Sequence, residues 1–176
     1  MVNPKMVVGA DLTKTYTATS GLSTSTNISN LPYRPGEVIV KSVDGGTKRY
    51  KFVLFMDIAA VAGYMATYTT RDDNFAVSTA AGDETSQVLQ PAGMAVVAVD
   101  EGKWGWIQTY GLNDVAMLTD GSVVAGQAVI PHATTDGAIG PYLATETGNN
   151  MCGNALNTDS GSVSAIGDIF LDCPKG

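Results

Sequence analysis

Between Gly93 and Gly140 the chain is a series of short apolar runs that are closed by turn residues. The runs are rich in Val, Ile, Trp and Tyr, and each of them ends at Gly, Asp or Asn. This pattern is typical of short antiparallel strands and leaves little room for helices. We therefore predict an all-β protein, a compact antiparallel β-barrel or sandwich domain with an extended N-terminal arm.

The charge of the chain is low and unevenly distributed. Only 15% of the residues are charged, against ~25% in typical soluble domains. Residues 1–99 carry eight basic and eight acidic side chains, whereas residues 100–176 carry two basic and nine acidic ones. Without a basic stripe to neutralise phosphates, we expect no nucleic-acid partner. The sparse charge indicates a surface that contacts other protein, and the acidic half either faces solvent between crowded copies or forms ordinary solvated loops.

The first 33 residues differ in composition from the rest. Residues 11–33 are dense in Thr, Ser and Asn and poor in large apolar side chains, so they cannot fold alone. We predict an extended arm at 1–33 and a β domain at 34–176, with Pro32 and Pro35 forming a hinge between them. The arm is either a loose terminus or a segment that orders against a neighbouring subunit. The chain shows no signal-peptide pattern and no membrane-length apolar run, so we expect synthesis in a cytoplasm and no membrane partner.

Residues 37–55 predict a β-hairpin. EVIVKSV forms one strand, the turn lies at residues 44–46, and TKRYKFVLF forms the returning strand. This hairpin holds the only basic cluster of the chain, which is either a solvated face that suppresses edge pairing or a contact surface for a partner. The candidate contact residues here and in the preceding hinge are Tyr33, Arg34, Lys41, Lys48, Arg49 and Lys51.

Two further regions have patterns that can be interpreted in two ways. Residues 57–70 could form a short Ala-rich helix, but Gly63 and the Thr run favour a strand. Residues 94–99 and 104–110 predict a hairpin in which Trp104, Trp106, Gln108 and Tyr110 share one face. This face belongs to the core, or else Trp104, Trp106 and Tyr110 form an exposed platform for stacking on carbohydrate.

Nothing in the sequence indicates catalysis. His132 is the only histidine, and no nucleophile-elbow or phosphate-binding motif accompanies it. Cys152 and Cys173 either pair or serve as small buried apolar residues. The stretch 157–168 departs from a calcium-loop pattern, because Gly161 falls one position early. We therefore predict no enzyme activity, no metal and no cofactor.

Several segments resemble a known family. GWIQTYG at 105–111, AGQAVIP at 125–131, TDGAIG at 135–140 and CGNAL at 152–156 resemble the β domain of tailed-bacteriophage capsid decoration (cement) proteins, over about residues 90–172. The resemblance implies a structural virion protein on the capsid exterior that stabilises contacts between major capsid subunits. The implied partners are the major capsid protein and further copies of the chain, as a trimer or threefold cluster. The alternatives are a head-fibre or tail subunit, or a carbohydrate-binding module.

Overall fold

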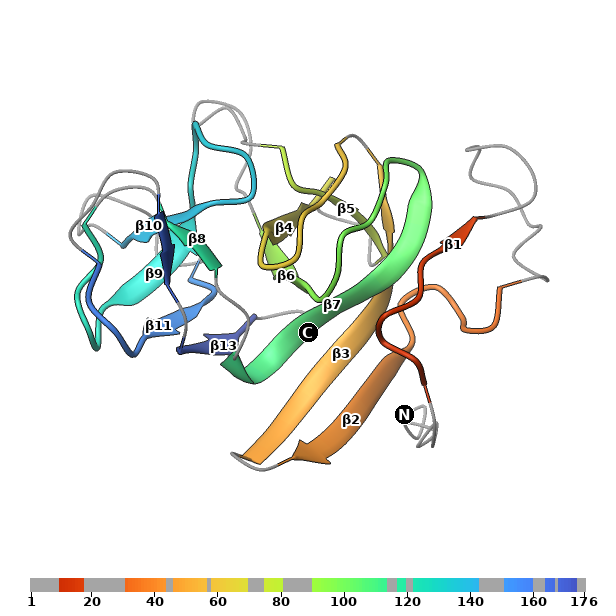
Figure 1. Ribbon diagram of the computed structural model, residues 1–176, viewed down its shortest axis with the longest axis horizontal. Coiled ribbons are helices and arrows are strands. Elements are labelled where there is room, and N and C mark those ends of the chain that lie inside the picture. Colours follow the sequence, from red (N-terminus) through yellow and green to blue (C-terminus); the bar gives the residue numbers. More distant parts are fainter. Residues whose placement is uncertain are drawn as a thin grey trace.

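The computed structural model describes residues 10–17, 31–43, 46–56, 58–69, 75–80, 90–113, 117–119, 122–142, 151–159, 164–166 and 168–173. Within these ranges every regular element is a strand and none is a helix, which confirms the all-β prediction (Figure 1). The strands are β1 (Tyr16–Thr17), β2 (Val38–Val43), β3 (Gly46–Phe55), β4 (Met65–Tyr68), β5 (Ala76–Ser78), β6 (Pro91–Ala95), β7 (Lys103–Asn113), β8 (Met117–Thr119), β9 (Ala128–Pro131), β10 (Ile139–Pro141), β11 (Gly153–Ala155), β12 (Ser164–Ile166) and β13 (Ile169–Asp172).

Five of these strands close into a barrel. The ring runs β3-β7-β6-β4-β5 and returns to β3. Four of its contacts are antiparallel, and β3 pairs β5 in parallel. A ring with an odd number of strands cannot alternate in direction all the way round, so one parallel pair is unavoidable. The interior is filled by buried apolar side chains, among them Val53, Phe55, Val77 and Ile107.

The long strand β7 joins the barrel to a second lobe. Its C-terminal half pairs β13, and the sheet then continues through β11, β9, β10, β8 and β12 (Figure 1). This lobe has a core of its own, which includes Val129, Ile139, Ile169 and Leu171. The two cores approach each other at β4, where the Met65 amide donates to the Gly137 carbonyl.

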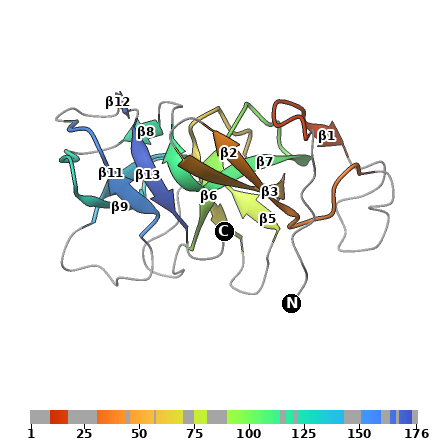
Figure 2. The same ribbon diagram turned by 90° about the horizontal axis from the view of Figure 1, so that it is seen from below.

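A third cluster lies outside the barrel, on the face of β3 and β7 that points away from its interior. Phe52, Trp104 and Trp106 form its centre, and the N-terminal arm covers it. Short strand β1 pairs β7 through Tyr16↔Trp104 and Thr17↔Lys103. Figure 2 shows β1 and the second lobe at opposite ends of the molecule. Residues 10–17 and 31–33 thus pack on the chain's own barrel, whereas residues 1–9 and 18–30 of the predicted arm lie outside the described ranges.

Most predicted strands are present, with shifted ends. The hairpin at 37–55 is confirmed as β2 and β3, although most of its turn falls on residues 44 and 45, which are not described. Residues 65–68 form a strand, as favoured over a helix. The hairpin predicted at 94–110 pairs β6 with β7, but β6 begins at Pro91 and ends at Ala95. Val99 then forms a separate bridge with Ala60, which lengthens the connection.

Candidate functional site

The basic side chains of the hairpin do not form one exposed surface. Lys48 and Lys51 are only 5% and 6% exposed, whereas Arg49 is exposed and Lys41 is half-buried. The prediction of a four-residue basic surface is therefore wrong for Lys48 and Lys51. The physical reason is that β3 is covered on both faces, by the barrel interior on one side and the third cluster on the other. A partner contact stays a prediction for Lys41, Arg49 and Arg34, which is exposed.

Lys51 is part of a buried polar pair. Its ammonium donates to the Tyr68 hydroxyl at 2.7 Å and lies 5.0 Å from the centre of the Tyr68 ring. Burial raises the pKa of Tyr68, so the hydroxyl stays neutral and accepts this hydrogen bond. The hydrogen bond and the ring contact offset part of the cost of burying this ammonium, which is not available to a partner.

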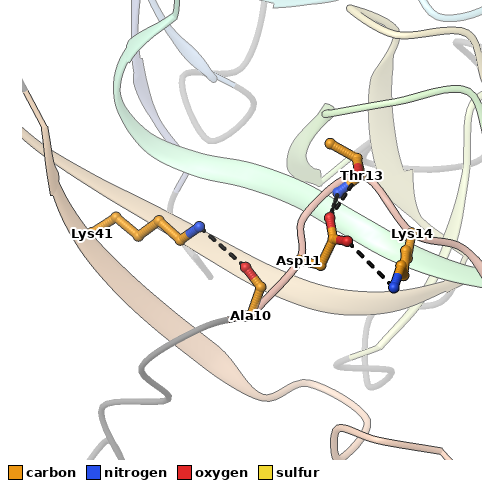
Figure 3. Close-up of polar contacts among 5 residues, drawn as sticks. All are labelled: Ala10, Asp11, Thr13, Lys14 and Lys41. Atoms are coloured by element: carbon orange, nitrogen blue, oxygen red, sulfur yellow. Dashed lines mark hydrogen bonds and ion pairs between the residues drawn. The ribbon is translucent and has the colours of Figure 1, made fainter.

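Lys41 has a local role. Its ammonium donates to the carbonyl oxygen of Ala10 at 3.2 Å, which ties the start of the described arm to β2 (Figure 3). Next to it, the Asp11 carboxylate accepts hydrogen bonds from the amide and hydroxyl of Thr13, at 3.0 and 2.6 Å. These bonds lower the pKa of Asp11 below its usual value. The turn at residues 11–14 is thus held by its own side chains.

The two tryptophans are core residues. Trp104 and Trp106 are 4% and 0% exposed. Phe52 stacks on Trp104 with ring centres 5.5 Å apart, and Tyr33 meets Trp106 edge-on at 4.8 Å. The core interpretation is confirmed for the two tryptophans, because a carbohydrate platform needs exposed rings. Tyr110, predicted on the same face, is half-buried and lies outside this cluster, because the pairing of β3 with β7 shifts register between Arg49↔Tyr110 and Tyr50↔Gln108. Tyr33, predicted as a partner contact, is half-buried in the same cluster.

Where β7 pairs with the hairpin and with β13, a group of exposed and half-buried side chains lies on neighbouring strands. The Arg49 guanidinium lies 4.8 Å from the centre of the Tyr110 ring, and Tyr110 meets Phe170 edge-on at 5.3 Å. Phe170 is 38% exposed and is the cross-strand partner of Leu112, while Val40, 41% exposed, is the partner of Arg49. We call these five residues, Val40, Arg49, Tyr110, Leu112 and Phe170, the outer patch.

Sequence reasoning identified two members of the outer patch, Arg49 and Tyr110, and missed the others. Phe170 carried a usable signal: in the alternating strand β13 it stands on the face opposite buried Ile169 and Leu171, beside exposed Asp172. An aromatic residue on the polar side of an alternating strand indicates a contact surface. Val40 and Leu112 gave no such signal, because nothing local distinguishes them from core positions.

The side chains named as candidates for chemistry are dispersed in the structure. No group of three or more His, Cys, Asp or Glu side chains among them is placed to hold a metal ion. His132 is half-buried, and its Nδ1 lies 3.4 Å from the Thr134 amide. Cys152 and Cys173 are free thiols in the core of the second lobe, as the apolar interpretation predicts. Across the same ranges, no helix has the length and apolar character needed to cross a membrane.

Comparison with known proteins returns little. No family model matches the chain. No curated protein matches it either. Among solved structures the chain is similar to the N base of gp8.5, the head fibre of bacteriophage phi29, with a TM-score of 0.44 and 16% sequence identity over 69% of this chain and 92% of that chain. At this identity and TM-score the similarity carries no inference about what the protein does.

Proposed function

We propose that this protein is a structural component of a tailed-phage virion that binds the outer surface of the assembled capsid and stabilises contacts between major capsid subunits. The class of function comes from the resemblance of residues 90–172 to capsid decoration proteins. The observation that carries the proposal is the outer patch, in which Val40, Arg49 and Phe170 are exposed and Tyr110 and Leu112 are half-buried. The partners are then the major capsid protein and further copies of the chain, grouped as a trimer or threefold cluster on the capsid exterior.

The composition of the outer patch suits a protein partner. Aromatic residues and Arg are enriched at the centres of protein interfaces, where they contribute most of the binding energy. In the outer patch a guanidinium, a phenol ring and a phenyl ring follow one another across three strands, β3, β7 and β13. A nucleic-acid partner would instead need several exposed basic side chains, and the burial of Lys48 and Lys51 removes two of the four in the hairpin.

The test is binding to capsids that lack the protein. We would measure co-sedimentation with undecorated capsids of the source phage for the unaltered chain, Phe170→Ser and Arg49→Ser. Val124→Ser is the matched control, because Val124 is 55% exposed and lies outside the outer patch. We expect each outer-patch variant to lose at least about tenfold in affinity, the size of a hot-spot truncation, and the control to bind normally.

Two outcomes would contradict the proposal. If the unaltered chain does not bind capsids, the function itself is wrong. If it binds and both outer-patch variants bind as tightly as the unaltered chain, the function holds but the outer patch is not the contact surface. Thermal unfolding of each variant shows that any loss of binding is not a loss of fold.

A further inference from the structure

Residues 10–17, which we call the strap, form a small unit that closes over the third cluster. At one end the Ala10 carbonyl accepts from Lys41, and at the other β1 pairs β7 (Figure 3). Between them, Leu12 and Tyr16 pack on the cluster, where Tyr16 meets Phe52 edge-on at 5.8 Å. Because Asp11 holds the turn from within the strap, the strap brings its own conformation to the surface on which it docks.

The strap is held by few contacts. Its backbone pairing with β7 extends over two residue pairs, Tyr16↔Trp104 and Thr17↔Lys103. In the same cluster the indole Nε1 atoms of Trp104 and Trp106 are buried and have no hydrogen-bond partner among the described residues. A buried donor without an acceptor lowers the net stability of the closed arrangement. Opening the strap therefore costs less than the aromatic contacts alone suggest.

The surface under the strap nevertheless needs a cover. Phe52, Trp104 and Trp106 are each less than 5% exposed with the strap in place. Opening would uncover Phe52, which Tyr16 contacts, and Trp104, the cross-strand partner of Tyr16, whereas Trp106 keeps its contact with Tyr33. Water disfavours the exposure of such large aromatic side chains. Once the strap has opened, the strap and the uncovered cluster therefore tend to pair again, either within the same chain or between two copies.

The segment between the strap and the barrel is long enough for the strap to dock on its own chain or on another copy. Residues 18–30 connect Thr17 to Leu31, which packs on the cluster. The 14 residue steps from Thr17 to Leu31 span up to about 46–50 Å when fully extended. This is comparable to the diameter of a domain of this size, so the strap of one copy can reach the third cluster of an adjacent copy.

We propose that the strap is an exchangeable strand, which docks on the β3–β7 face of a second copy of the chain and links copies in concentrated solution. The contacts within one chain and between two chains are the same, so the balance is decided by the local concentration of copies. A virion surface would supply a high local concentration, but the exchange itself does not depend on capsid binding.

Disulfide trapping tests the exchange without a capsid. Thr17 and Lys103 are cross-strand partners, so Cys at both positions can form a disulfide where β1 meets β7. The single variants Thr17→Cys and Lys103→Cys are mixed at about 1 mM, within the effective-concentration range of flexible linkers, and oxidised slowly. Thr17→Cys mixed with Asn154→Cys, which is exposed on β11, is the control for random collisions.

We expect a covalent heterodimer between Thr17→Cys and Lys103→Cys in several-fold excess over the control mixture, with the 17–103 linkage identified by mass spectrometry. The double variant Thr17→Cys/Lys103→Cys, oxidised at high dilution, should close within one chain. If the double variant closes and the mixture gives no excess heterodimer, the strap does not exchange and the proposal is overturned. If the double variant does not close, the pairing of β1 with β7 is wrong, and the proposal fails with it.

Discussion

Replacing Gly111 by Ala should destabilise the protein far more than the same change at Gly126. Both glycines have positive φ angles, +95° and +84°, which L-residues with a Cβ rarely adopt. At Gly126 an added Cβ would meet no atom within 4 Å. At Gly111 it would overlap the carbonyl oxygen of Thr47 and lie 3.2 Å from the Cα of Lys48. These are backbone atoms of β3, so no side-chain rotation relieves the overlap.

Both substitutions therefore strain the backbone, but only Gly111→Ala also creates a steric overlap. The backbone strain of a non-glycine residue at such a φ costs about 1–2 kcal/mol. Because alanine also restricts the unfolded chain, about 0.4–1 kcal/mol of this destabilisation is offset. Gly126→Ala should thus lower the free energy of unfolding by about 1 kcal/mol. Gly111→Ala must in addition separate β3 from β7 near Arg49↔Tyr110, and each backbone hydrogen bond lost there costs about 1 kcal/mol or more, giving a total of about 3 kcal/mol.

Thermal unfolding followed by circular dichroism separates the two cases. For a chain of this size 1 kcal/mol shifts Tm by about 2–4 °C, so we expect Gly126→Ala to lower Tm by about 2–4 °C and Gly111→Ala by about 6–12 °C. Gly111 also stands between Tyr110 and Leu112 of the outer patch, so its variant should disturb that surface. Equal Tm shifts for the two variants would refute the close approach of β3 to β7.

Two further predictions concern titratable groups. Burial raises the pKa of Cys152 to about 12 and holds that of Cys173 well above its usual value. Neither thiol should therefore react with an aromatic disulfide reagent at pH 8 until the protein unfolds, and rapid reaction of the folded protein would contradict their burial. The lowered pKa of Asp11 means that its carboxylate stabilises the turn at residues 11–14 above its unfolded-state pKa of 3.8, and that this contribution is lost as pH falls through the lowered value. In the unaltered chain the Thr13 amide should therefore lose its protection from hydrogen exchange, corrected for the intrinsic rate, in strong acid. In Asp11→Asn the protection of this amide should be the same at every pH.

The local features of this protein followed from its sequence. Turn residues that close short runs rich in β-branched and aromatic residues exclude long helices, and the sequence alone therefore determined the strands and the 37–55 hairpin. The core position of Trp106 was likewise predictable from the sequence, because alternation places it on one face with Trp104 and Gln108. Each of these conclusions depends only on residues that are neighbours in the chain.

Which strand faces are covered was decided by the tertiary structure alone. Alternation shows that Lys51 and Tyr50 point to opposite sides of β3, but not that the closed ring buries one side and the strap the other. The outer patch arises in the same way, because Arg49, Tyr110 and Phe170 come from strands that are far apart in sequence and adjacent only after β7 has paired with both β3 and β13. Burial and adjacency of this kind depend on long-range pairing, which a local pattern of residue types does not encode.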